Sequence, residues 1–168
     1  MEYTYKHLIP EDFSNTSKVW IYQSSRKFAM SEALQIEAIM EDFLENWKSH
    51  GEPVKGYANL FFGQFLILMA DDSVSVGGCS TYESVKILKQ IETLFNVSLF
   101  DRQSLAFIVK DKIELLPLAQ LNFAIEHNHI LPTTPYFNNL VATKEDLLNK
   151  WIIPAKDSWL KSKIQVTV

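Results

Sequence analysis

The stretch FLILMA, residues 65–70, restricts the fold more than any other part of the sequence. Its residues are apolar without alternation, which is typical of a strand covered on both faces. Such a strand needs other elements packed above and below it. The sequence therefore predicts a layered domain with this strand near the middle of a sheet.

The strand belongs to a predicted hairpin that runs from Glu52 to Asp72. VKGYANLFF and QFLILMA flank Gly63, and Gly63-Gln64 fits the two-residue loop of a type II′ turn, which needs glycine first. Two further segments predict strands from their β-branched and aromatic residues. They are KVWIYQS, from Lys18 to Ser24, and a second hairpin within residues 105–116.

A long amphipathic helix is predicted between the first strand and the first hairpin. In SEALQIEAIMEDFLENWKSHG the apolar residues recur at the three-to-four spacing of a helix. Ser31 is the expected N-cap, and Gly51 is expected to end the helix in the left-handed conformation. The apolar face is long enough to cover one face of a sheet.

A second long helix is predicted after the central strand, in STYESVKILKQIETLFN. Ser80 followed by Glu83 matches the S-x-x-E capping box, which predicts that the helix starts at Ser80. Asn96 is expected to end it. Gly77 and Gly78 are expected to form the turn that leads into the helix.

The order strand, helix, strand, strand, helix, strand predicts an α+β fold with the ferredoxin-like split βαβ arrangement. In that arrangement one antiparallel sheet carries both long helices on one face. We expect a single domain over residues 1–168, with this core at about 18–116 and a C-terminal helical extension at about 117–168.

The extension contains two predicted helices, one opened by Pro117 and one from Thr143 as N-cap through Trp151. The tail WIIPAKDSWLKSKI contains Trp151 and Trp159, and exposed tryptophan pairs are uncommon on monomers. The tail is therefore expected to cover the other face of the sheet or to contact a partner subunit. A homodimer through a sheet edge or through this tail is the predicted assembly.

Charge and composition disfavour several classes of protein. The chain has 16 basic and 20 acidic residues and no cluster of Lys and Arg, so nucleic-acid binding is not expected. MEYTYKHLIPEDF lacks the features of a secretory signal. The longest apolar run is far shorter than the roughly 20 residues that span a membrane. A single cysteine forms no internal disulfide, and a cytoplasmic protein is expected.

Motifs of several enzyme classes are missing from the sequence. It contains no G-x-x-x-x-G-K-[ST], no G-x-G-x-x-G, no G-x-S-x-G and no H-E-x-x-H. Hydrolysis of nucleotides by a P-loop is therefore not expected. His127 and His129 lie two residues apart, which on a helix places them on different faces, so no metal site is predicted and no cofactor is expected.

The sequence GGCSTYES offers the most suggestive chemistry, because Cys79 precedes the expected helix start. A helix dipole contributes about 0.3 to 1 kcal/mol to a thiolate, too little on its own to make the thiol reactive at neutral pH. Three interpretations remain. Cys79 fills a small apolar pocket, the backbone N–H groups of residues 79–82 bind an anion, or Cys79 serves as a nucleophile or redox group.

The other candidate ligand contacts are polar residues beside this segment and beside strand ends. Gly78 and Ser80 flank Cys79, and Arg26 follows the first strand. Asp101 and Arg102 follow the second helix, where a local ion pair or a turn is the simpler interpretation. An unknown small ligand held by Gly78, Ser80, Arg26 and Arg102 is one hypothesis.

Taken together, VWIYQSSR, the W-x-x-HG of residues 47–51, GGCS, LFDR, FNNLV and KDSW resemble a family of small bacterial proteins of about this length. The resemblance covers nearly the whole chain and implies a shared fold but no established activity. Some members carry the label "ABC transporter ATPase", which conflicts with the missing Walker motifs. The family pattern has an acid where this chain has Tyr82, which weakens any mechanism that uses such an acid.

These observations favour a non-catalytic binding or interaction domain. The alternative is a small cysteine-dependent enzyme or redox-sensitive protein that uses Cys79. Sheets of the expected type carry many unrelated activities, so the fold alone does not decide between the two.

Overall fold

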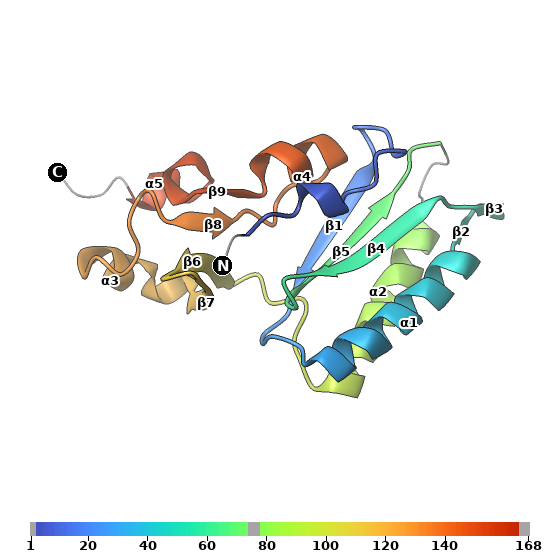
Figure 1. Ribbon diagram of the computed structural model, residues 1–168, viewed down its shortest axis with the longest axis horizontal. Helices are drawn as coiled ribbons and strands as arrows, with labels where there is room; N and C mark the ends of the chain where they lie inside the picture. The colour runs from blue at the N-terminus through green and yellow to red at the C-terminus, as the bar shows by residue number, and fades with distance from the viewer. Residues whose placement is uncertain (1–2, 74–77, 165–168) are drawn as a thin grey trace.

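A computed structural model describes residues 3–73 and 78–164, without the side chains of residues 78–80 (Figure 1). The α-helices are α1 Met30–Asn46, α2 Gly78–Phe95, α3 Leu121–Glu126, α4 Lys144–Lys150 and α5 Lys161–Ile164. The strands are β1 Lys18–Gln23, β2 Lys48–Ser49, β3 Glu52–Pro53, β4 Gly56–Phe61, β5 Phe65–Ala70, β6 Ser104–Val109, β7 Lys112–Pro117, β8 Pro135–Phe137 and β9 Ile152–Pro154. The fold is α+β, as predicted.

The first sheet has the order β1-β5-β4, with β5 antiparallel to both neighbours. All six residues of β5 are buried, which confirms that FLILMA forms a central strand covered on both faces. Leu66, Leu68 and Ala70 face α1 and α2, which lie side by side under one face of the sheet (Figure 1). Phe65, Ile67 and Met69 face the opposite side.

The opposite face of this sheet is covered by two segments from the ends of the chain. The N-terminal segment contributes Tyr5, Ile9 and Phe13, and the region of α4 contributes Leu147 and Trp151. Trp151 is fully buried, so the prediction that the tryptophan-containing region covers the other face is confirmed for this residue. The core therefore extends beyond the expected residues 18–116.

A second sheet has the order β7-β6-β8-β9 and packs with α3 and α5 in a separate cluster of buried residues. The predicted four-stranded ferredoxin-like sheet is therefore not confirmed, because β6 pairs with β7 and β8 instead of β1. The outer edge of β1 is occupied by residues 142–144, where Val19 N–H donates to Ala142 O at 3.0 Å. The C-terminal extension is not only helical, since it supplies β8 and β9.

Both predicted helix starts differ from the structure. Helix α1 begins at Met30 after the cap residue Ala29, whose N–H donates to the Glu32 carboxylate at 2.8 Å, so Ser31 lies inside the first turn. Gly51 does not end this helix, because α1 ends at Asn46. Helix α2 begins at Gly78, so Ser80 lies inside the helix and is not its N-cap.

The loop between β4 and β5 differs from the prediction, whereas the cap at Thr143 agrees with it. Phe61 pairs with Phe65, so the β4–β5 loop has three residues, Phe62 to Gln64, in place of the predicted two. Gly63 has the positive φ of +67° that such a loop needs. The predicted cap at Thr143 is confirmed, because its hydroxyl accepts from Asp146 N–H at 3.2 Å.

Candidate functional site

The residues that the sequence singled out do not form one site. Gly78, Cys79 and Ser80 lie in the first turn of α2, where their side chains fall outside the described atoms. Arg26 lies at the other end of this helix, where its guanidinium donates to Phe95 O at 2.7 Å. Helix α2 has 18 residues and is therefore about 27 Å long. Arg26 and Ser80 cannot contact the same small ligand.

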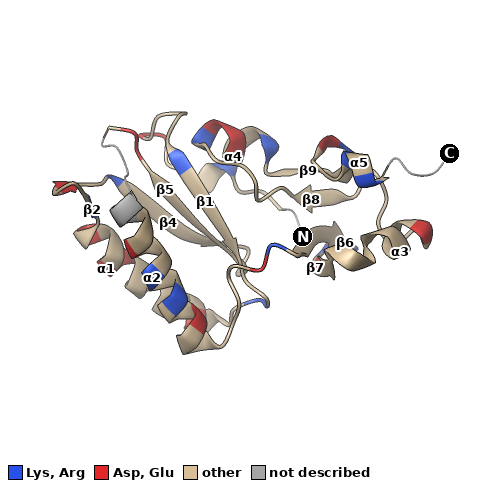
Figure 2. Cartoon of the chain, turned by 180° about the vertical axis from the view of Figure 1, so that it is seen from behind, with Lys and Arg blue, Asp and Glu red and all other residues tan. Residues whose placement is uncertain are grey.

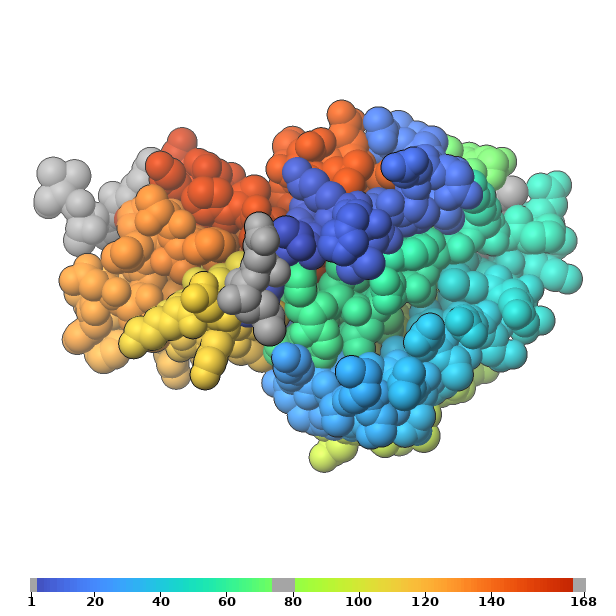
Figure 3. All heavy atoms as spheres, in the orientation of Figure 1, coloured from blue at the N-terminus to red at the C-terminus, as the bar shows by residue number. Residues whose placement is uncertain are grey.

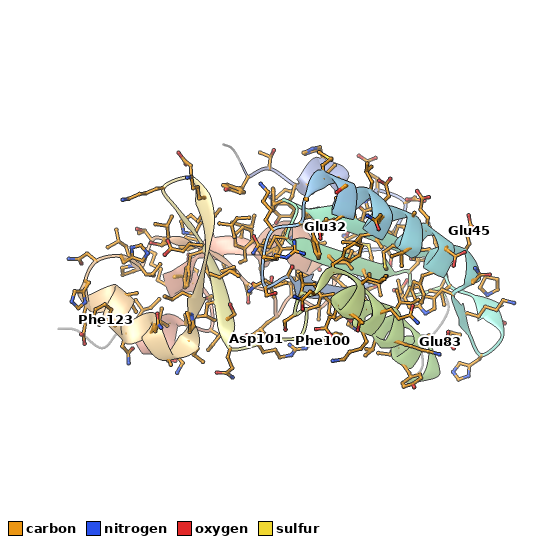
Figure 4. All side chains as sticks on the ribbon, turned by 90° about the horizontal axis from the view of Figure 1, so that it is seen from below. Glu32, Glu45, Glu83, Phe100, Asp101 and Phe123 are labelled. Carbon is orange, nitrogen blue, oxygen red and sulfur yellow. The ribbon has the colours of Figure 1, made fainter. Side chains whose placement is uncertain are left out.

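Figure 4 shows the same separation from the labelled side chains. Glu83 lies near the start of α2, whereas Phe100 follows its end, on the side where Glu32 marks the start of α1. The two long helices therefore run in opposite directions. Any site at Cys79 lies at the end of the sheet away from Arg26.

Arg26 is held in an ion pair that leaves it little capacity for a ligand. Its two terminal nitrogens each donate to a Glu32 carboxylate oxygen at 2.8 Å. This bidentate bond, with the N–H of Ala29, lowers the pKa of Glu32 to about 2. Arg26 therefore joins the start of α1 to the end of α2 and has a structural role.

Asp101 and Arg102 also have local explanations. The Asp101 carboxylate accepts from Gln103 N–H at 2.8 Å, which is the turn expected as the simpler interpretation. Arg102 lines a small hollow of about 100 Å³ between β1, β6 and Trp159. That volume holds a few atoms of a ligand at most, well below the roughly 300 Å³ of typical ligand pockets.

A much larger hollow lies along the free edge of β4, and we call it the edge groove. Its volume is about 1040 Å³. Figure 3 shows it between the β6–β7 hairpin, the β4–β5 hairpin and the start of α1. Its lining comes from α1 (Met30, Ala33, Leu34, Ile36, Glu37, Met40), β4 (Ala58, Asn59, Leu60), the adjoining loops (Ser25–Phe28, Phe62–Gln64), and Leu66, Tyr3, Asp111, Lys112, Ile113 and Leu115.

The floor of the edge groove is a strand edge with no neighbouring strand in the described sheets. Asp71 N–H donates to Lys55 O at 2.9 Å, so Lys55 and Asp71 form a hydrogen-bonded pair just before β4. In an antiparallel ladder every second residue bonds to the partner strand, so the odd-numbered residues of β4 bond to β5. Ala58 and Leu60 consequently point their backbone N–H and C=O groups away from the sheet. The Leu60 N–H donates to the Asn59 side-chain oxygen at 2.9 Å, which leaves the groups of Ala58 facing the groove.

One wall of the groove is a stripe of α1 in which Met30, Leu34 and Glu37 follow at helical spacing. Met30 is 77% exposed and Leu34 is 60% exposed, which is high for apolar side chains on a helix packed against a sheet. The stripe ends where α1 approaches β4. A methyl group on Gly56 would lie 2.7 Å from Leu44 Cδ2 and 2.9 Å from Trp47 Cε3, so glycine permits this close approach.

The groove lies towards the other end of β4, where its lining includes Phe62–Gln64 but not Gly56. Phe28 N–H donates to Gly63 O at 2.8 Å and fixes the loop before α1 against the β4–β5 turn. The Lys27 side chain packs over Gly63, with its Cε 3.2 Å from where a Cβ would lie. The groove is therefore a wedge that narrows from Gly63 towards Gly56.

Charges are distributed unevenly along this wedge. Lys27 and Lys112 lie at the open end with Asp111, and neither lysine forms an ion pair within the part of the chain that the structure describes. Glu37 lies on the helical wall, on a helix that has five acidic and no basic residues (Figure 2). The open end is the basic end of the groove and the helical wall is acidic.

Two apolar residues of α1, Met30 and Leu34, could have indicated this groove from the sequence, but the stronger apolar stripe of the buried face drew attention away from them. The stripe of Ile36, Met40 and Phe43 predicts the buried face of α1, and it is buried. Met30 and Leu34 lie outside that stripe, four residues apart, as apolar residues on the predicted solvent face. An edge position for β4 could not be inferred, because strand order is not encoded in the order of elements.

The described residues contain neither a cluster suited to a metal ion nor a helix suited to cross a membrane. No group of three or more His, Cys, Asp or Glu side chains in residues 3–73 and 78–164 is placed to hold a metal ion. His129 lies 2.6 Å from Glu114, and His127 contacts Phe123 O at 2.8 Å. None of the described helices has both the length and the apolar character to cross a bilayer.

Comparison with family models, curated proteins and solved structures gives no match for this chain. The edge groove is therefore the feature of the molecule that best indicates its function. Its elements are an unpaired strand edge, an apolar helical wall and a basic open end.

Proposed function

We propose that the protein is a non-catalytic interaction module that binds an extended segment of another protein in the edge groove. The observation that carries the proposal is that the unpaired edge of β4 forms the floor of an apolar groove of about 1040 Å³. Addition of a strand to such an edge combines main-chain hydrogen bonds with pockets for alternate side chains. The Ala58 backbone supplies the bonds, and the wedge beside Leu34 accepts an apolar side chain.

The alternative drawn from the sequence is an enzyme that uses Cys79. Such an enzyme could not use Arg26 as a ligand contact, because Arg26 binds Glu32 and Phe95 at the opposite end of α2 from Cys79. The strand order β1-β5-β4, with α1 between β1 and β4, is the order of the first three strands of a ferredoxin-like sheet. We propose that the fold is a variant of that arrangement in which β6 belongs to the second sheet instead of the first.

A random-peptide display library selected against the immobilised protein tests the proposed function. Selected peptides should bind the wild type, and Leu34→Asp should weaken them about tenfold or more, as expected for loss of a central apolar contact. Leu34 is 60% exposed, so the substitution should leave stability nearly unchanged. Binding should also slow hydrogen exchange at the Ala58 amide.

Leu94→Asp is the matched control for this experiment. Leu94 is 65% exposed on α2 and does not line the edge groove. Peptides that bind Leu34→Asp as tightly as Leu94→Asp, or that leave the Ala58 amide unaffected, would exclude the edge groove as the binding site.

A further inference from the structure

The charges of the edge groove indicate which kind of segment it accepts. This inference rests on the proposed function, because it describes the occupant of the same groove. We infer that the bound segment carries a carboxylate at the open end, an apolar side chain in the wedge and a cation beside the α1 wall.

The open end has an uncompensated positive charge. Among the described lining residues at this end, Lys27 and Lys112 contribute two cations and Asp111 one anion, which leaves one positive charge. Arg26 does not add to it, because Glu32 neutralises it at 2.8 Å. The start of α1 lies at the same end, and the positive end of its helix dipole also favours a negative charge.

The helical wall has the opposite sign. Glu37 lines the groove, and Glu41 follows one turn later on the same side of α1. Neither carboxylate forms an ion pair with any residue in the described ranges. A cation on the bound segment would find both charges within reach.

The spacing of these charges fits a strand. Seven residues separate Met30 from Glu37, which is about 10 Å along the helix. An extended chain rises about 3.3 Å per residue and turns alternate side chains to one face. A carboxylate at one position, an apolar residue two positions on and a cation two further on span about 13 Å, which reaches from Glu37 past Met30 to the side of the groove where Lys27 lies.

A second copy of this chain fits these charges less well. Pairing two β4 strands about a twofold axis would place both α1 helices on the same face of the joined sheet. The two acidic α1 helices, which carry Glu37 and Glu41, would then lie on the same side of the joined sheet, and like charges repel. A fatty acid satisfies the carboxylate and the apolar wedge but leaves the Ala58 backbone and Glu37 without partners.

Fluorescent peptides of defined sequence test the inference. The parent probe is acetyl-Thr-Glu-Thr-Leu-Thr-Lys-Thr-amide, and three companions carry Gln for Glu, Gln for Lys or Asn for Leu. The Glu to Gln change should weaken binding to the wild type about 3- to 10-fold at low salt, and added salt should reduce this difference.

Two double variants make the measurement specific. In Lys27→Gln/Lys112→Gln the Glu and Gln probes should bind equally. Lys86→Gln/Lys161→Gln changes the net charge by the same amount at exposed sites outside the groove, and there the difference should persist. Decanoate should not displace the parent probe.

The outcomes separate this inference from the proposed function. Equal binding of the Glu and Gln probes by the wild type, with sensitivity to Leu34→Asp retained, would overturn the inference and leave the proposed function intact. If library peptides bind the groove but the parent probe does not, the inference is likewise overturned and the proposed function stands. Displacement by decanoate would indicate a lipid ligand and overturn both.

Discussion

The ion pair between Arg26 and Glu32 makes stability depend on pH in a definite direction. The pKa of Glu32 falls from 4.5 in its ordinary state to about 2 in the folded protein, because Arg26 and the Ala29 N–H bind the ionised form. A carboxyl group whose pKa is lowered by folding stabilises the folded protein at pH values above its pKa in the unfolded chain. This stabilisation is lost as the pH falls through the pKa of the folded state. The contribution should therefore be complete above about pH 5 and disappear towards pH 2.

Substitution of Glu32 by Gln tests this directly. Glu32→Gln should lower the melting temperature at pH 6, and the difference from the wild type should shrink steadily as pH falls towards 2. Glu41→Gln on the same helix is the control, since Glu41 makes no ion pair in the described part of the chain. A difference for Glu32→Gln that stays constant with pH would contradict the role given to the ion pair.

Gly56 determines the shape of the edge groove, because it lets α1 touch β4 at the closed end. Gly56→Ala places a methyl group 2.7 Å from Leu44 Cδ2 and should cost about 1 to 3 kcal/mol, as other overpacked contacts do. Denaturant melts measure the loss. Leu44→Ala should recover part of it in the double variant, and strictly additive effects of the two substitutions would show that the contact does not set the helix position.

Local signals in the sequence identified the elements well but not their exact ends. Helical periodicity located α1 and α2, because it records which side chains are buried, and runs of apolar, β-branched and aromatic residues located both long hairpins. The start of α1 was misplaced because its cap residue is Ala29 and not Ser31. At α1 the Glu32 side chain binds the Ala29 N–H, and Ser31, the more familiar cap residue, lies in the first turn.

The arrangement of the strands depended on contacts between distant parts of the chain, which no local pattern encodes. The segment around Ala142 bonds to Val19 and takes the edge that β6 was expected to occupy. Gln23 joins the two sheets through its bonds to Ser104 O at 3.0 Å and to the Asn139 amide at 2.9 Å. The edge groove follows from this arrangement, since β4 is left at the other edge.

The assembly state depends on which of these edges stays open. The sequence predicted a homodimer through a sheet edge or the tryptophan-containing tail, but Trp151 is fully buried within its own chain and only Trp159 is partly exposed, at 39%. The segment around Ala142 bonds to the start of β1, whereas no strand in the described sheets pairs with the outer edge of β4, so β4 is the more open edge of the first sheet. There the acidic wall of α1 opposes pairing with itself.

Light scattering at micromolar concentration should therefore give the mass of a single chain, 19.4 kDa. High salt should raise any tendency to pair, because it screens the repulsion between the two α1 helices. Twice this mass for the wild type, reduced to a single chain by Leu34→Asp and retained by Leu94→Asp, would show that a second copy occupies the edge groove. Twice the mass in all three proteins would place the interface elsewhere and leave the groove free for a segment of another protein.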